Sequence, residues 1–199
     1  MGKRAYGGTR STYVPLVRRG RRMTTAEYLA TPESLLPTEL DHGRFMARDA
    51  PTIWHQDAVG AIYTALRSHL AASGEGRAWM APVDVVLDFD KAVVVQPDVV
   101  VVTSGRMDRV TSRINGAPDL AVEVLSPLPR VGQIHQKLSW FAHYGVRECW
   151  VVHLDSRRVE VLTFEGGATM AHAVFEAEAT LVSGVLPSFT PTVQGLVFG

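Results

Sequence analysis

Three charged residues, Asp98, Glu123 and Lys137, occur in an order and in surroundings that could support phosphoryl-transfer chemistry. Asp98 follows Pro97 inside the valine-rich run VVVQPDVVVV, and Glu123 lies among apolar residues in PDLAVEVLSP. Both runs are typical of buried strands, where a carboxylate is costly unless a cation, a proton or hydrogen bonds compensate it. Two such carboxylates could share a divalent cation, and hard oxygen ligands favour Mg²⁺ or Mn²⁺.

Lys137 lies on the helix that is expected to follow the Glu123 strand. If this helix begins near Val131, a rise of 1.5 Å per residue places Lys137 roughly 9 Å along its axis, from where it could reach the two acids. Its ammonium could orient an attacking water molecule or stabilise the charge that develops on a phosphate, while the metal lowers the pKa of its bound water. Pro97 would end strand pairing beside Asp98 and open the sheet to a substrate.

The elements that must position these residues are short strands and two amphipathic helices. Apolar residues at spacings of three and four predict helices over about 52–72 and 131–144, each followed by a glycine. A short helix capped by Thr24 or Thr25 and a hairpin with His42-Gly43 at its turn precede them. Strands are expected as a meander at about 77–81, 83–90, 92–96 and 98–103, then around Glu123, and in several segments from about 147 to Leu186. This order predicts a mixed α/β sheet with a few flanking helices.

Length and composition indicate one soluble domain. The chain has 199 residues and a hydrophobic fraction of 46%. No apolar run approaches the roughly 20 residues of a membrane span. Cys149 is the only cysteine, in a segment where its thiol is expected to pack in a strand, and this usage fits a reducing cytoplasm.

The net charge of zero conceals an uneven distribution of basic residues. Residues 1–22 contain seven lysines and arginines and no acid, so we expect a flexible basic N-terminal arm (1–22) before a single folded domain (23–199). The arm could bind DNA phosphates, or it could be a solvated tail or a targeting segment. The arginines expected to contact nucleic acid are Arg18, Arg19, Arg21 and Arg22.

The motifs QPDVVVV, GAPDLAVEVLSP and QKLSWFAHYGVRECWVV, in this order, resemble the Uma2 family, also called DUF820. These are restriction-endonuclease-like proteins of the PD-(D/E)xK nuclease superfamily, and the similarity spans about residues 24–162. The resemblance implies a restriction-endonuclease-like core, in which a few helices flank a central mixed β-sheet with extra strands. It identifies Pro97-Asp98 with the PD element of the superfamily.

The resemblance also assigns roles to residues. It implies that Asp98 and Glu123 bind Mg²⁺ or Mn²⁺, with the main-chain carbonyl of Val124 as a further ligand. Glu39, in TELDHGRFM, matches an early acidic position of the family. In the superfamily the catalytic lysine usually lies two residues after the second acid. Lys137 resembles such a lysine that has moved to the following helix.

Two positions depart from the family pattern and leave a second function open. Gln133 and His153 stand where Uma2 sequences often carry aspartate. The first hypothesis is a Mg²⁺-dependent endonuclease that hydrolyses DNA phosphodiesters by water attack; the alternative is a catalytically weak or inactive DNA-binding or regulatory protein. An accessory protein of an assembly or a mobile element is a third reading. A homodimer is expected by analogy with nucleases that cut both strands.

The remaining candidates are better explained by structural roles. His55, just before the long helix, could contact a phosphate, but we expect it to cap the helix or to pack. The sequence contains no HExxH, G-x-S-x-G or P-loop motif. The tryptophans could stack on bases, but they are expected to pack in the core: Trp54, Trp79, Trp140 and Trp150.

Overall fold

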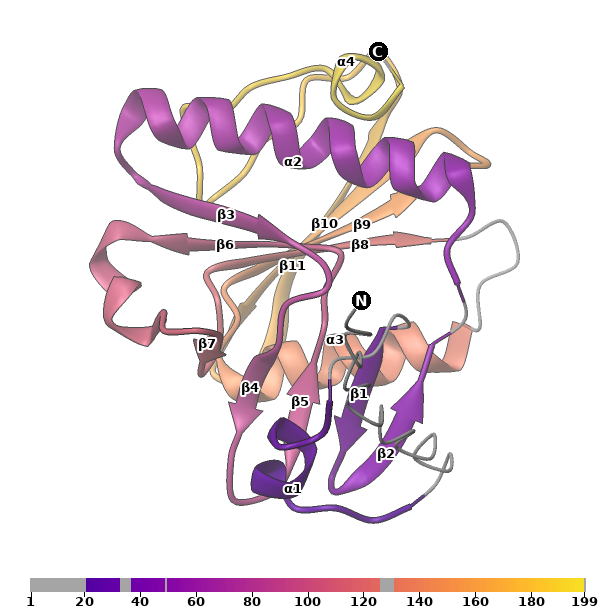
Figure 1. The fold of residues 1–199 in the computed structure, drawn as a ribbon. Helices are drawn as coiled ribbons and strands as arrows, with labels where there is room; N and C mark the ends of the chain where they lie inside the picture. Colours follow the sequence, from indigo (N-terminus) through magenta and orange to yellow (C-terminus); the bar gives the residue numbers. More distant parts are fainter. Residues whose placement is uncertain (1–20, 33–36, 49, 126–130, 199) are drawn as a thin grey trace, which may run out of the picture.

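Two mixed β-sheets and a few helices make up the computed structural model, which describes residues 21–32, 37–48, 50–125 and 131–198 (Figure 1). This mixed α/β architecture confirms the expected fold class. The strands are β1 (Thr38–Asp41), β2 (Arg44–Ala47), β3 (Gly76–Met80), β4 (Val85–Asp88), β5 (Val93–Val95), β6 (Val99–Thr103), β7 (Ile114–Asn115), β8 (Leu120–Leu125), β9 (Glu148–His153), β10 (Arg158–Glu165) and β11 (Ala168–Glu176). The helices are α1 (Thr25–Leu29), α2 (Ile53–Ser73), the 3-10 helix η1 (Ser104–Arg109), α3 (Val131–Tyr144) and α4 (Val193–Val197).

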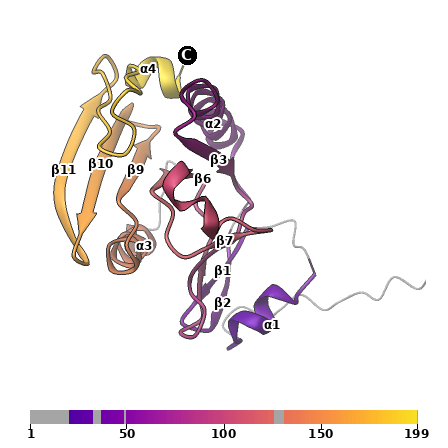
Figure 2. The ribbon, with the colours of Figure 1, turned by 90° about the vertical axis from the view of Figure 1, so that its left-hand side faces the viewer.

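The larger sheet has the strand order β11-β10-β9-β8-β6-β3, with α2 on one face and α3 on the other (Figures 1 and 2). Val99 and Val101 of β6 pack in the cluster that contains the apolar face of α2. Val100 and Val102 point the other way, into the cluster that contains α3. Because both faces of β6 are buried, the strand is a continuous run of valines rather than an alternating pattern.

The smaller sheet has the order β2-β1-β5-β4-β7, and it corrects the expected meander. All four strands predicted between residues 77 and 103 are present within two residues of their expected ends. However, β3 pairs with β6, and the β4–β5 hairpin between them belongs to the smaller sheet. The chain returns from one sheet to the other through Gln96, Pro97 and Asp98. Pro97 therefore lies where strand pairing stops, as its missing N–H requires.

The helices begin and end at the expected kinds of residue. Thr52 caps α2 by accepting a hydrogen bond from the His55 backbone N–H, and Gly74 ends it with a φ of 73°. Thr24 forms a capping box at α1. Within the described residues no helix is long and apolar enough to cross a membrane.

The C-terminal part differs from the prediction. The expected strands up to Leu186 end with β11 at Glu176, and only an isolated bridge between Thr180 and Thr192 follows. The short helix α4 was not predicted. Cys149 is fully buried in β9, which confirms a packing role for its thiol.

Most of the expected basic arm, including Arg18 and Arg19, lies outside the described residues. Arg21 and Arg22 are described and exposed, and they run beside the hairpin of β1 and β2. Arg22 forms an isolated bridge with Arg44, and the backbone carbonyl of Arg21 accepts a hydrogen bond from Phe45.

Candidate active site

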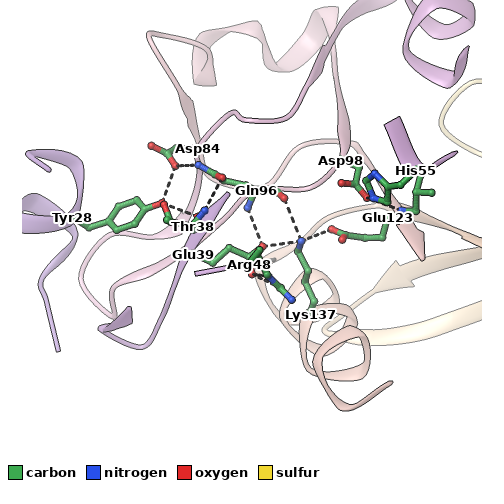
Figure 3. A network of polar contacts seen from close by, with 11 residues as sticks. Tyr28, Thr38, Glu39, Arg48, His55, Asp84, Gln96, Asp98, Glu123 and Lys137 are labelled. Carbon is green, nitrogen blue, oxygen red and sulfur yellow. Dashed lines mark hydrogen bonds and ion pairs between the residues drawn. The ribbon is translucent and has the colours of Figure 1, made fainter. Parts of the chain in front are cut away.

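Asp98 and Glu123 lie side by side on neighbouring strands. In the antiparallel register of β6 and β8, Val99 is opposite Val122, so the next pair along places Asp98 opposite Glu123. The backbone N–H of Val124 donates a 2.7 Å hydrogen bond to Asp98 Oδ2. Figure 3 shows the two acids side by side, as expected. Val124 follows Glu123 in β8 and contacts Asp98 through its backbone N–H.

Lys137 projects from α3 into the same region and is almost completely buried (Figure 3). Its Nζ lies 2.6 Å from Glu123 Oε1 and 2.8 Å from Glu39 Oε1, and it donates a 3.4 Å hydrogen bond to the Gln96 carbonyl. Two carboxylates and one main-chain carbonyl therefore surround the ammonium group. Lys137 was expected to reach both Asp98 and Glu123. It contacts Glu123, but its second carboxylate partner is Glu39 rather than Asp98.

Arg48 completes the surroundings of Glu39 and was missed by the sequence analysis. Glu39 Oε2 accepts a 2.8 Å hydrogen bond from Arg48 Nε and is also paired with its Nη2. Because the β1–β2 hairpin places Thr38 opposite Ala47, a residue just beyond Ala47 can reach Glu39 across the hairpin. The predicted turn at His42-Gly43 would have supplied this register.

His55 is buried, which fits the packing part of its expected role, and it also contacts Asp98, which was not expected. Its Nε2 lies 3.3 Å from Asp98 Oδ2, and its side chain is largely buried. Thr52, not the His55 side chain, caps the helix. The α2 helix thus supplies a side chain to the site from the face of the sheet opposite α3.

Gln96 holds the connection between the two sheets in place. Its backbone N–H donates a 3.2 Å hydrogen bond to Glu39 Oε1. Its side-chain amide donates to Asp84 Oδ1 at 2.9 Å and accepts from the Thr38 backbone N–H at 3.1 Å. The segment that carries Asp98 is therefore fixed by both its main chain and its side chains.

The two buried glutamates and Lys137 have pKa values that are shifted by burial and by one another. Burial, together with the nearby carboxylates of Asp98 and Glu39, raises the pKa of Glu123 to about 7 against the opposing effect of Lys137. Burial also disfavours ionised Glu39, but Lys137 and Arg48 outweigh it and hold the pKa of Glu39 below its ordinary value. Burial lowers the pKa of Lys137, yet Glu123 and Glu39 raise it above its ordinary value. Lys137 is therefore charged at neutral pH.

The donor atoms at Asp98 and Glu123 fit a hard divalent cation. The carboxylates of Asp98 and Glu123 repel each other, and the pKa of Glu123 is raised to about 7. A bound cation would compensate their negative charge. Among the residues that the structure describes, no group of three or more His, Cys, Asp or Glu side chains is arranged to hold a metal ion. Mg²⁺, however, is commonly held through one or two carboxylates together with water and substrate oxygens.

Two other buried acids, Asp119 and Glu148, have structural partners. Asp119 lies 3.3 Å from Arg147 Nη1 and accepts hydrogen bonds from Thr103. Glu148 accepts a 2.7 Å hydrogen bond from Trp150 Nε1 and a 2.6 Å hydrogen bond from the Ser183 hydroxyl. These carboxylates are each neutralised or fully hydrogen-bonded, so burial alone does not distinguish a candidate catalytic acid.

The remaining sequence candidates have different surroundings. His153 Nε2 is 2.9 Å from Glu160 Oε1 at the end of β9. The side chain of Gln133 is outside the described part of the structure. Trp150 is fully buried, as expected, whereas Trp54 is exposed, which contradicts its expected place in the core.

Comparison with known proteins gives a family and a fold. The model of the Uma2 family, described as "Putative restriction endonuclease", matches residues 25–194. A search of curated proteins finds no match. A solved structure, described as that of a putative nuclease belonging to DUF820 from Anabaena variabilis ATCC 29413, superposes with a TM-score of 0.75 at 20% sequence identity. It covers 88% of this chain and 97% of its own.

Proposed function

The chain belongs to the Uma2 family, and from this premise we propose that it is a metal-dependent endonuclease that hydrolyses phosphodiester bonds in DNA. One observation carries the proposal: Asp98 and Glu123 are adjacent on neighbouring strands, and Lys137 Nζ is 2.6 Å from Glu123. The two carboxylates and the Val124 carbonyl would hold Mg²⁺ or Mn²⁺. When bound, the cation would polarise the phosphate and lower the pKa of a water molecule.

The protein's own residues orient the carboxylates. Asp98 is fixed by the Val124 N–H and by His55, and Glu123 is fixed by Lys137. Because these contacts are already made in the free protein, the carboxylate oxygens need little reorganisation to meet a cation and a substrate.

Lys137 would act as a charged hydrogen-bond donor rather than as a base. Its raised pKa keeps the ammonium protonated at neutral pH, so it cannot accept a proton from water. An ammonium in a buried site stabilises the negative charge that develops on phosphate oxygens. Glu39 and Arg48 would be positioning residues, since Glu39 contacts Lys137 and Arg48 contacts Glu39.

The proposed reaction is ordinary hydrolysis. A water molecule loses a proton to solvent as its oxygen forms a bond to phosphorus, and the bond from phosphorus to one ester oxygen breaks. One product strand ends in a phosphate and the other in a hydroxyl, whose proton comes from solvent. A homodimer that cuts both strands and a cytoplasmic location remain predictions.

The test is titration of Mn²⁺ into the protein by calorimetry, with nicking of supercoiled plasmid measured in parallel. We expect the wild-type protein to bind Mn²⁺ and nick DNA, and Asp98→Asn and Glu123→Gln to lose both. Asp119→Asn is the matched control, because Asp119 is a buried acid beside the same strand but with arginine partners. Wild-type protein that neither binds Mn²⁺ nor nicks DNA would refute the proposal.

The second candidate is a DNA-binding or regulatory protein without turnover. It is favoured by the contacts that Lys137 already makes, since three oxygen atoms lie within 3.4 Å of its Nζ in the free protein. This candidate predicts DNA binding that needs no metal, weakens as salt is raised and is reduced by deletion of residues 1–22. Binding that is insensitive to both changes would exclude it.

A further inference from the structure

The first turn of α2 carries two large apolar side chains that are exposed beside the site. Ile53 and Trp54 are each 68% exposed, whereas the next residue, His55, is buried and contacts Asp98. Figure 1 shows that this end of α2 lies on the same side of the molecule as the end of β8 that follows Glu123. Because an indole is large and mostly apolar, leaving it in water is unfavourable. Core packing therefore does not account for the tryptophan at this position.

Three exposed apolar residues are neighbours of site residues in the sequence or in the strand register. Seven large hydrophobic side chains are exposed among the described residues, and these three are among them. Ile53 and Trp54 immediately precede His55, and Met80, which is 42% exposed, pairs with Val99, the residue after Asp98. Three side chains are far fewer than the roughly 20 residues that each partner contributes to a specific protein interface. One exposed indole is enough, however, to contact the face of one nucleobase.

We infer that Trp54 stacks on an unpaired base of the DNA substrate, next to the phosphodiester that Asp98 and Glu123 address. This inference rests on the proposed function. An indole stacks on any base, because every base has a π-face. In an uninterrupted duplex both faces of an internal base are covered by its neighbours, so the indole reaches a face only where the strand is single or distorted. The substrate class is therefore single-stranded DNA or an unpaired segment of a duplex.

The experiment measures DNA binding by the full chain in EDTA, so that metal-dependent cleavage does not interfere. Fluorescence anisotropy gives the dissociation constants for a labelled single-stranded oligonucleotide and for the duplex of the same sequence. The variants are Trp54→Ala and Trp54→Phe, with Phe89→Ala as the matched control. Phe89 is also an exposed aromatic residue, at 56%, but it lies in the turn between β4 and β5, at the opposite end of β5 from Gln96. Plasmid nicking with Mn²⁺ is measured on the same preparations.

We expect Trp54→Ala to weaken single-stranded binding by about 5- to 150-fold, the range that loss of one stacked base gives. Trp54→Phe should recover most of the affinity, and Phe89→Ala and duplex binding should be unchanged. An oligonucleotide with 2-aminopurine should lose fluorescence on binding to the wild-type protein but not to Trp54→Ala. Wild-type protein that nicks DNA while Trp54→Ala binds single strands equally well would overturn this inference alone. Wild-type protein that neither binds nor nicks DNA would overturn the proposed function as well.

Discussion

Replacement of Glu123 by glutamine should change how the stability of the protein depends on pH. Burial and the neighbouring carboxylates raise the pKa of Glu123 from 4.5 to about 7 in the folded protein. Between these two values the folded state holds more protons than the unfolded state. The contribution of Glu123 to the free energy of unfolding is therefore greatest below pH 4.5 and falls as the pH rises toward and through 7.

The size of the effect follows from the same two pKa values. The interval from 4.5 to about 7 corresponds to about 3 kcal/mol at about 1.4 kcal/mol per pH unit, and about 2.5 kcal/mol of this falls between pH 5 and pH 8. Glutamine has nearly the same shape and does not ionise. The wild-type protein should therefore lose about 2.5 kcal/mol relative to Glu123→Gln over this pH range.

Urea unfolding at intervals of half a pH unit, without divalent metal, measures this difference. The quantity to plot is the free energy of unfolding of the wild-type protein minus that of Glu123→Gln, because titrating groups that do not interact with Glu123 cancel in the difference. Glu178→Gln, at an exposed carboxyl group, is the control. A difference that stays flat from pH 5 to pH 8, or that rises, would mean that Glu123 is already ionised at pH 5 and would refute the account of its burial.

Three further predictions concern the charges around the site. Lys137→Met leaves the buried carboxylates of Glu39 and Glu123 without their shared ammonium, so we expect a loss of about 3–5 kcal/mol and a melting temperature about 6–20 °C lower, measured by calorimetry at pH 8. If the variant melts like the wild-type protein, the ion pairs contribute little. Asp119→Asn removes the charge that faces Arg147 and should cost about 2 kcal/mol in urea unfolding while Mn²⁺ affinity is retained; a loss of Mn²⁺ binding would contradict its structural role. Mn²⁺ should raise the melting temperature of the wild-type protein more at pH 8 than at pH 6, because a ligand must be deprotonated to bind, and an equal effect at both values would argue against Glu123 as a ligand.

The central pair of acids could be predicted because its signals are local. An acid in a valine-rich strand is conspicuous, and a proline before it marks the end of pairing. The reach of Lys137 followed from helical geometry once the start of α3 was predicted near Val131, where the structure places it. These inferences needed only the period of each element and the direction of the chain.

The division into two sheets could not be predicted in the same way. Residues 85–95 have the composition of strands, but composition does not state which strand is the partner. The hairpin of β4 and β5 pairs with β1 and β7 instead of β3 and β6, through contacts distant in sequence. The prediction that Trp54 packs in the core was wrong for a related reason. Its apolar side chain fits a helix pattern, yet the first turn of α2 leaves it exposed.

The burial of Lys137 has a consequence for the cooperativity of folding. Glu39 belongs to the smaller sheet and Glu123 to the larger one, and a single ammonium from α3 is bound to both. If either sheet opened by itself, a charge in the other would lose its partner in an apolar environment, which makes partial opening costly. The same three side chains that are proposed to serve catalysis would thus join the two halves of the molecule into one cooperative unit.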